Sequence, residues 1–99
     1  MDKKILDFLG IARRAGRLSL GTDAVMEAVN KKKSKLIITA CDISERTRNN
    51  VVKIAKQGNI KTVFSEIPME SFGSAIGKAV GIISVNDEGF AKRLEELFA

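Results

Sequence analysis

The chain has 99 residues with one cysteine, no histidine, and 17 Lys and Arg against 12 Asp and Glu, a net charge of +5. These counts exclude an intramolecular disulfide and any imidazole base, and we expect a single domain over residues 1–99. No apolar run approaches the ~20 residues of a membrane span, so we expect a cytoplasmic location. The positive charge favours an anionic partner, without distinguishing RNA from DNA or a membrane surface.

The first predicted helix covers residues 3–14 and ends at Gly16. Arg13, Arg14 and Arg17 cluster around this end. Cations at a helix C-terminus interact favourably with the helix dipole, so a solvated helix end competes with an anion-binding role for this cluster.

A short strand, a turn and a second helix follow. Leu18–Leu20 alternates apolar and polar residues as a half-buried strand does, and Gly21 turns the chain. Thr22 or Asp23 is expected to cap the helix, which ends at the cationic stretch 30–33. A helix N-terminus at the end of a strand suits polar or anionic ligands, phosphate included.

The apolar run at residues 36–40 predicts a buried central strand. Cys41 follows it, and we expect a small buried residue rather than a nucleophile. Asp42 and Ser44 are expected to supply turn and capping groups for a third helix that runs to about Gln57.

The remaining chain predicts two more strands, at 60–64 and 82–85. A helix between them has Pro68 in its first turn and is expected to bury side chains as far as Ala79. A last helix follows the turn at 86–89. Helices and strands therefore alternate, which predicts an α/β fold: a three-layer α/β/α sandwich with a small four-stranded sheet, which we expect to be mixed. The pattern assigns no strand directions.

The stretches that could suggest a catalytic or cofactor site lack the residues that such a site requires. The stretch 73–79 is similar to a phosphate-binding loop, but three residues separate its glycines instead of four and Ala79 replaces the Ser or Thr that binds magnesium. Asp23, Asp42 and Asp87 are single, scattered acids typical of turns and caps. We therefore expect no enzyme activity, no cofactor and no metal.

Three stretches together resemble one known family. They are GRLSLGTDAVMEAV, KSKLIITACDIS and GSAIGKAVGIISVNDEGFAKRL, within a similarity that covers about residues 5–97. The chain resembles the L-seven-Ae and L-thirty-e family of ribosomal and kink-turn RNA-binding proteins, and most of all its small bacterial members of the YlxQ type. The resemblance implies an α/β/α sandwich that binds the kink-turn, a sharp bend in duplex RNA with a bulge and tandem G·A pairs.

The resemblance also implies which residues contact RNA. The glycine turn and the second helix would enter the groove at the G·A pairs, the loop before the last strand would pack on bulged nucleotides, and an acidic position would precede the third helix. With Arg17 from the basic cluster and Glu27 from the groove-facing side of the second helix, the candidate RNA-binding residues are Arg17, Gly21, Thr22, Asp23, Glu27, Asp42, Lys78, Val80, Gly81 and Ile82.

Three positions depart from the family pattern. Many members have asparagine where this chain has Asp23, then a glutamate and a lysine on guanine edges where this chain has Ala24 and Glu27. The leading hypothesis is therefore a non-enzymatic RNA-binding protein, associated with the ribosome or another ribonucleoprotein, that recognises bent RNA. The alternative is a protein–protein adaptor of the same fold that has lost kink-turn specificity.

Overall fold

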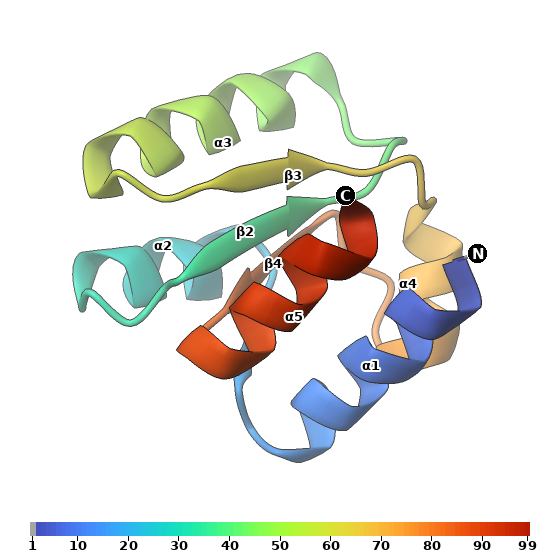
Figure 1. The fold of residues 1–99 in the computed structure, drawn as a ribbon. Helices are drawn as coiled ribbons and strands as arrows, with labels where there is room; N and C mark the ends of the chain where they lie inside the picture. Colours follow the sequence, from blue (N-terminus) through green and yellow to red (C-terminus); the bar gives the residue numbers. More distant parts are fainter. Residues whose placement is uncertain (1) are drawn as a thin grey trace.

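The computed structural model describes residues 2–99, in which helices and strands alternate (Figure 1). The predicted order of elements is confirmed. The elements are α1 (Asp2–Arg14), β1 (Leu18–Leu20), α2 (Thr22–Asn30), β2 (Leu36–Thr39), α3 (Glu45–Gly58), β3 (Thr62–Phe64), α4 (Met69–Ile76), β4 (Ile82–Val85) and α5 (Glu88–Phe98).

The four strands form one mixed sheet in the order β1-β4-β2-β3, which confirms the predicted sheet. The last strand, β4, lies between β1 and β2 and runs antiparallel to both. β2 and β3 are parallel, with α3 as the crossover between them. The ends of β1 and β2 and the start of β4 therefore meet at one edge of the sheet.

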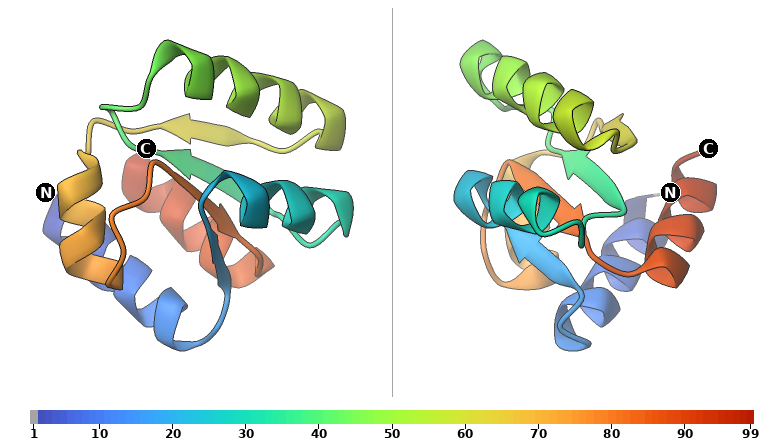
Figure 2. Two further views of the ribbon diagram at one scale, coloured as in Figure 1. Left: turned by 180° about the vertical axis from the view of Figure 1, so that it is seen from behind. Right: turned by 90° about the vertical axis from the view of Figure 1, so that its left-hand side faces the viewer.

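Helices cover both faces of the sheet, as the two turned views show (Figure 2). On one face Ile37 and Ile82 pack with apolar residues of α2 and α3. On the other face Leu36, Ile38 and Ile83 pack with α1, α4 and α5. Neighbouring residues of a strand point to opposite faces, so β2 and β4, which are buried at all four positions, contribute to both cores.

The two predicted helix caps near the strand ends have different outcomes. Ser44 caps α3 as predicted, since its hydroxyl accepts the Thr47 amide at 3.1 Å. The prediction that Thr22 or Asp23 caps α2 is wrong: the capping position is Gly21, which offers no side-chain hydrogen bond. Gly21 has φ 89° and ψ 164°, a region that is essentially restricted to glycine, and this geometry shifts the helix start by one residue.

The fourth helix is shorter than predicted. α4 ends at Ile76 because Gly77 adopts a left-handed conformation with φ 82°. Ala79, expected in the buried face of this helix, is exposed in the following loop. The third strand is also shorter than residues 60–64, since it begins at Thr62.

Cys41 is exposed, so the prediction of a buried cysteine is wrong. β2 ends at Thr39, and the chain turns before the third helix begins. The Cys41 backbone amide donates to the Ile67 carbonyl at 2.9 Å, which holds the main chain in place while the side chain faces solvent.

Cys41→Ala should therefore change the free energy of unfolding by less than about 0.5 kcal/mol, as surface substitutions do. In the native wild-type protein the thiol should react with an aromatic disulfide reagent at a rate close to that in denaturant. A thiol that reacts only after unfolding would contradict the exposed position.

Candidate nucleic-acid interface

Backbone hydrogen bonds to carbonyls at the start of β4 bring three segments together. The Gly21 amide donates to the Ile82 carbonyl at 3.0 Å, and the Ala40 amide donates to the Gly81 carbonyl at 2.9 Å. The N-terminus of α2, the connector after β2 and the loop before β4 consequently converge at one edge of the sheet.

A groove of about 460 Å³ lies where these segments meet. Six of the ten residues predicted from the sequence line it: Gly21, Thr22, Asp42, Val80, Gly81 and Ile82. The sequence reasoning missed the other four lining residues, which are Ile43, Ser44, Thr47 and Met69. These four residues reach the groove because β4 lies antiparallel to β1 and β2. The sequence pattern does not assign strand directions, so it could not predict this placement.

The first turn of α2 supplies hydrogen-bond donors to this groove. The amides of the first residues of an α-helix have no acceptor within the helix. The capping residue of α2 is Gly21, which has no side chain to accept a hydrogen bond from them. Thr22, Asp23 and Ala24 are the first three residues of this nine-residue helix, and Thr22 lines the groove. Amides at this positive end of the helix dipole are suited to an oxygen acceptor of a ligand.

The groove's other polar groups are hydroxyls and one carboxylate. The Ser44 and Thr47 hydroxyls lie 3.0 Å apart, and the Asp42 carboxylate accepts the Met69 amide at 2.9 Å, where it caps α4 rather than α3. Among the described residues that line the groove there is no Lys or Arg. Such a lining suits neutral donor and acceptor edges, such as nucleobases and ribose hydroxyls, better than bare phosphate.

The loop before β4 contributes backbone and one lysine rather than apolar side chains. The Val80 and Ile82 side chains are buried, at 6% and 2% exposed, so they belong to the core. Lys78 and Ala79 are the exposed side chains of this loop. Contacts from positions 80–82 to a ligand would therefore come from the main chain.

The two acids of α2 lie on its exposed surface. Asp23 in the first turn is exposed, a favourable place for a carboxylate near the helix N-terminus. One turn later, the Lys31 ammonium donates to the Glu27 carboxylate at 2.7 Å. This hydrogen bond and the attraction to Lys31 hold the pKa of Glu27 below its ordinary value.

Arg17 lies away from the groove. It precedes β1, and its carbonyl accepts the Asn86 amide at 2.8 Å, beyond the far end of β4. Of the ten predicted residues, Arg17 is therefore at the opposite edge of the sheet from Gly21.

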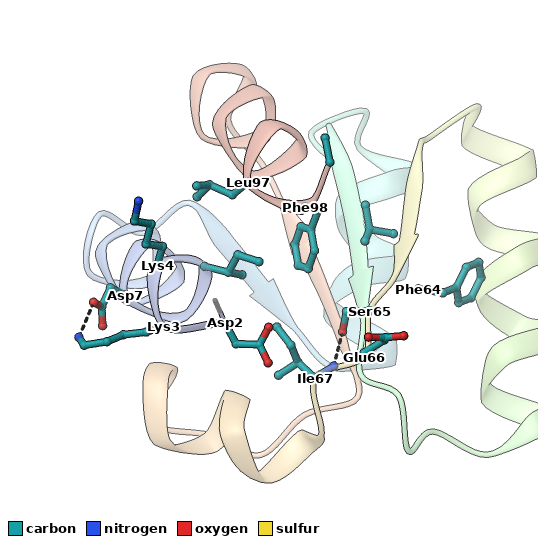
Figure 3. Close-up of a pocket in the computed structure, with 13 residues that line it drawn as sticks. Asp2, Lys3, Lys4, Asp7, Phe64, Ser65, Glu66, Ile67, Leu97 and Phe98 are labelled. Atoms are coloured by element: carbon teal, nitrogen blue, oxygen red, sulfur yellow. Dashed lines mark hydrogen bonds and ion pairs between the residues drawn. The ribbon is translucent and has the colours of Figure 1, made fainter.

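A larger cavity of about 1040 Å³ lies between the N-terminus of α1, the end of β3 and the C-terminus of α5 (Figure 3). Its charged lining has three carboxylates, on Asp2, Asp7 and Glu66, against two lysines, Lys3 and Lys4, and Lys3 is paired with Asp7 at 2.8 Å. This lining is unsuited to an anionic ligand. Within residues 2–99 we find no group of three or more potential metal ligands and no helix long and apolar enough to cross a membrane.

The arrangement of helices, mixed sheet and groove agrees with one family model. Residues 3–95 match the Ribosomal protein L7Ae/L30e/S12e/Gadd45 family. The chain belongs to this family, as the sequence resemblance indicates.

Named relatives lie within the same family. The RNA-binding protein YlxQ of Enterococcus faecium is 32% identical over 101 residues, covering 96% of this chain and 91% of the relative. The RNA-binding protein YlxQ of Bacillus subtilis is 31% identical over 91 residues, covering 90% and 89%. The large ribosomal subunit protein eL30 of Candida glabrata is 28% identical over 83 residues, covering 82% and 79%.

Solved structures show the same fold. A protein of unknown function from Bacillus halodurans C superposes with a TM-score of 0.84 at 32% identity and covers 96% of both chains. The Giardia lamblia 15.5kD RNA binding protein superposes with a TM-score of 0.75 at 16% identity, covering 98% of this chain and 83% of that protein. At this lower identity the second match shows the fold alone.

Gly81→Ala should destabilise the protein by about 1–3 kcal/mol, as overpacking does. A Cβ at this position would lie 2.6 Å from Ile43 Cγ2, which lines the same groove. The measurement is the free energy of unfolding of the four members of a double-mutant cycle. In the Ile43→Ala background, which lacks that methyl group, the same change should cost at least about 1 kcal/mol less. Equal costs in both backgrounds would contradict the close approach.

Proposed function

We propose that this protein binds RNA at a bend of the kink-turn type. In this complex the groove at the N-terminus of α2 would contact the nucleotides that the bend exposes. The observation that carries the proposal is the convergence of uncapped helix amides, hydroxyls and the β4 loop in one groove without a cation. Relatives at 31–32% identity that are named RNA-binding proteins support RNA as the ligand.

A bend is the form of RNA that this groove fits. The major groove of regular duplex RNA is too deep and narrow for side chains, whereas unpaired or splayed nucleotides present their edges. The α2 amides would donate to base or phosphate oxygens, and the Asp23 carboxylate would accept from guanine amino and imino groups. Lys78, exposed in the loop before β4, would contact the backbone next to the bulge.

The second candidate is a protein–protein adaptor of the same fold. Ala24 and Glu27 favour it, because they replace the glutamate and lysine for which the family resemblance implies contacts to guanine edges.

Association with the ribosome or another ribonucleoprotein is part of the leading proposal, supported by the similarity to a ribosomal protein.

The first experiment compares a kinked RNA with a straight duplex of equal length. The protein should bind the kinked RNA at least about tenfold more tightly at a fixed salt concentration. Roughly four phosphate contacts would release counterions and weaken binding about 100-fold between 50 and 200 mM salt. Equal affinity for both RNAs, or an affinity that salt leaves unchanged, would contradict the proposal.

The matched variant for this experiment is Gly21→Val. No atom lies within 4 Å of a Cβ at position 21, so the added side chain meets open space and only the positive φ is strained. The variant should lose the preference for kinked RNA while some stability is lost, as circular dichroism during thermal unfolding would record. A folded variant that binds kinked RNA normally would place the interface elsewhere.

Glu27→Lys should tighten binding to kinked RNA severalfold and steepen the salt dependence. The change removes an acid from the face that carries Asp23 and releases Lys31 from its 2.7 Å ion pair. Each additional phosphate bound by a cation should make the slope of log affinity against log salt more negative by about 1. Binding is measured by fluorescence anisotropy on kinked and straight RNA.

Glu27→Gln is the control, because it releases Lys31 without adding a cation at position 27. It should tighten binding less than Glu27→Lys does. Equal increases in affinity for kinked and straight RNA would mean that net charge alone acts, and the assignment of this face to the bend would then be wrong.

A further inference from the structure

Six of the 17 Lys and Arg of this chain gather at the edge of the sheet opposite the groove. The Lys35 amide donates to the Val85 carbonyl and the Asn86 amide donates to the Arg17 carbonyl, both at 2.8 Å. These bonds bring the connector after α1 and the connector after α2 to the same end of β4. We call the resulting cluster the basic end; its exposed members are Arg13, Arg14, Arg17, Lys32, Lys33 and Lys35.

The basic end is distant from the groove and carries an excess of positive charge, of which only Lys33 also attracts the Glu27 carboxylate. In Figure 1 the connector between α2 and β2 lies at the left, whereas α4 and the connector between β2 and α3 lie at the right. The nine residues of α2 separate the two ends by about 14 Å of helix. Within residues 2–99 the ion pairs involve Lys3, Lys31, Lys61 and Arg93, so no member of the basic end is paired with a carboxylate.

Lys32 occupies a backbone conformation that favours glycine. At the end of α2 the Lys33 amide donates a hydrogen bond to the Ala28 carbonyl at 2.8 Å, and the Lys32 amide donates to the Val29 carbonyl at 3.0 Å. This pattern places Lys32, with φ 60°, at the left-handed position where glycine is most common. A lysine here costs stability relative to glycine, so the cation stands at this position against the local backbone preference.

A hollow of about 590 Å³ lies beside Lys32. Lys32, Ser34 and Lys35 line it on one side, and Gln57 and Gly58 at the end of α3 line the other. The Lys32 and Lys35 ammonium groups and the Gln57 amide provide donors around this open hollow for the oxygens of a phosphodiester backbone, whereas the Ser34 hydroxyl is buried and accepts the Ser84 hydroxyl at 2.7 Å.

We infer that the basic end is a second RNA-binding surface, which holds the phosphate backbone of a duplex arm extending away from the bend bound in the groove. The inference rests on the proposed function. The groove, lined by hydroxyls and the Asp42 carboxylate, reads the bend, and the basic end supplies the cations that the described groove lining does not contain. Phosphate contacts position RNA without reading its sequence, so this surface adds affinity and orientation but no sequence preference.

The test uses two kinked RNAs that differ only in one arm, which is either cut short next to the bend or longer by one helical turn. Wild type should bind the long-arm RNA about tenfold or more tightly than the short-arm RNA at 0.1 M salt. The triple variant Arg17→Gln/Lys32→Gly/Lys35→Gln should lose that advantage. Its salt slope on the long-arm RNA should fall by about 2–3, with the short-arm affinity unchanged.

Lys32→Gly alone separates binding from stability, and Asn59→Gly is its matched control. Asn59 also has a left-handed backbone, with φ 54°, at the end of α3, but it carries no charge. Both variants should leave Tm unchanged or raise it by up to about 5 °C. Only Lys32→Gly should weaken long-arm binding.

The outcomes distinguish this inference from the proposed function. If wild type prefers kinked RNA and the triple variant binds the long-arm RNA as wild type does, the basic end does not bind RNA and only this inference fails. Equal losses on the long-arm and short-arm RNAs would mean that net charge alone acts, which also overturns it. A wild-type protein without preference for kinked RNA would overturn the proposed function and this inference together.

Discussion

The position of β4 between β1 and β2 is the constraint on which the rest of the molecule depends. Two consecutive carbonyls at the start of this strand, on Gly81 and Ile82, accept the amides of Ala40 and Gly21. Those two bonds join the end of the central strand to the turn that begins α2. Together with the pairing of β4 to both strands, they bring the helix N-terminus, the Asp42 turn and the loop before β4 to the common edge where the groove lies.

The same antiparallel strand divides the molecule into two chemically different ends. At the start of β4 the surface offers amides, hydroxyls and the Asp42 carboxylate, which are groups that exchange hydrogen bonds with neutral edges. At its other end the two connectors offer lysines and arginines that form no ion pair with a carboxylate of residues 2–99. A long anionic polymer with locally exposed edges is a ligand that can use both ends at once, and RNA at a bend has this form.

The order of elements could be predicted from the sequence because the apolar patterns are short, clean and separated by turn residues. Residues 82–85 form a strand as predicted, and Ser44 caps α3 as its residue type predicts. The wrong predictions concern residues whose position is determined by tertiary contacts. Cys41 follows an apolar strand but faces solvent because the main chain turns after Thr39. The Cys41 amide is bound to the carbonyl of Ile67, which is distant in the sequence.

The candidate site could be predicted only in part, for the same reason. Six groove residues belong to motifs that the family resemblance identifies, whereas Ile43, Ser44, Thr47 and Met69 reach the groove through strand directions that the sequence pattern does not give. The uncapped start of α2 could not be predicted either, because Thr22 and Asp23 are good capping residues by type. The backbone of Gly21, with φ 89°, makes both of them part of the helix.

The central claim is that the uncapped amides at the start of α2 face the RNA. It is tested most directly by two-dimensional NMR of isotope-labelled protein titrated with kinked RNA and, separately, with a straight duplex. The account predicts that the Thr22, Asp23 and Ala24 amides shift strongly with kinked RNA and much less with the straight duplex, together with amides of the loop before β4. Shifts confined to the cavity between α1 and the end of β3, with the start of α2 unaffected, would contradict it.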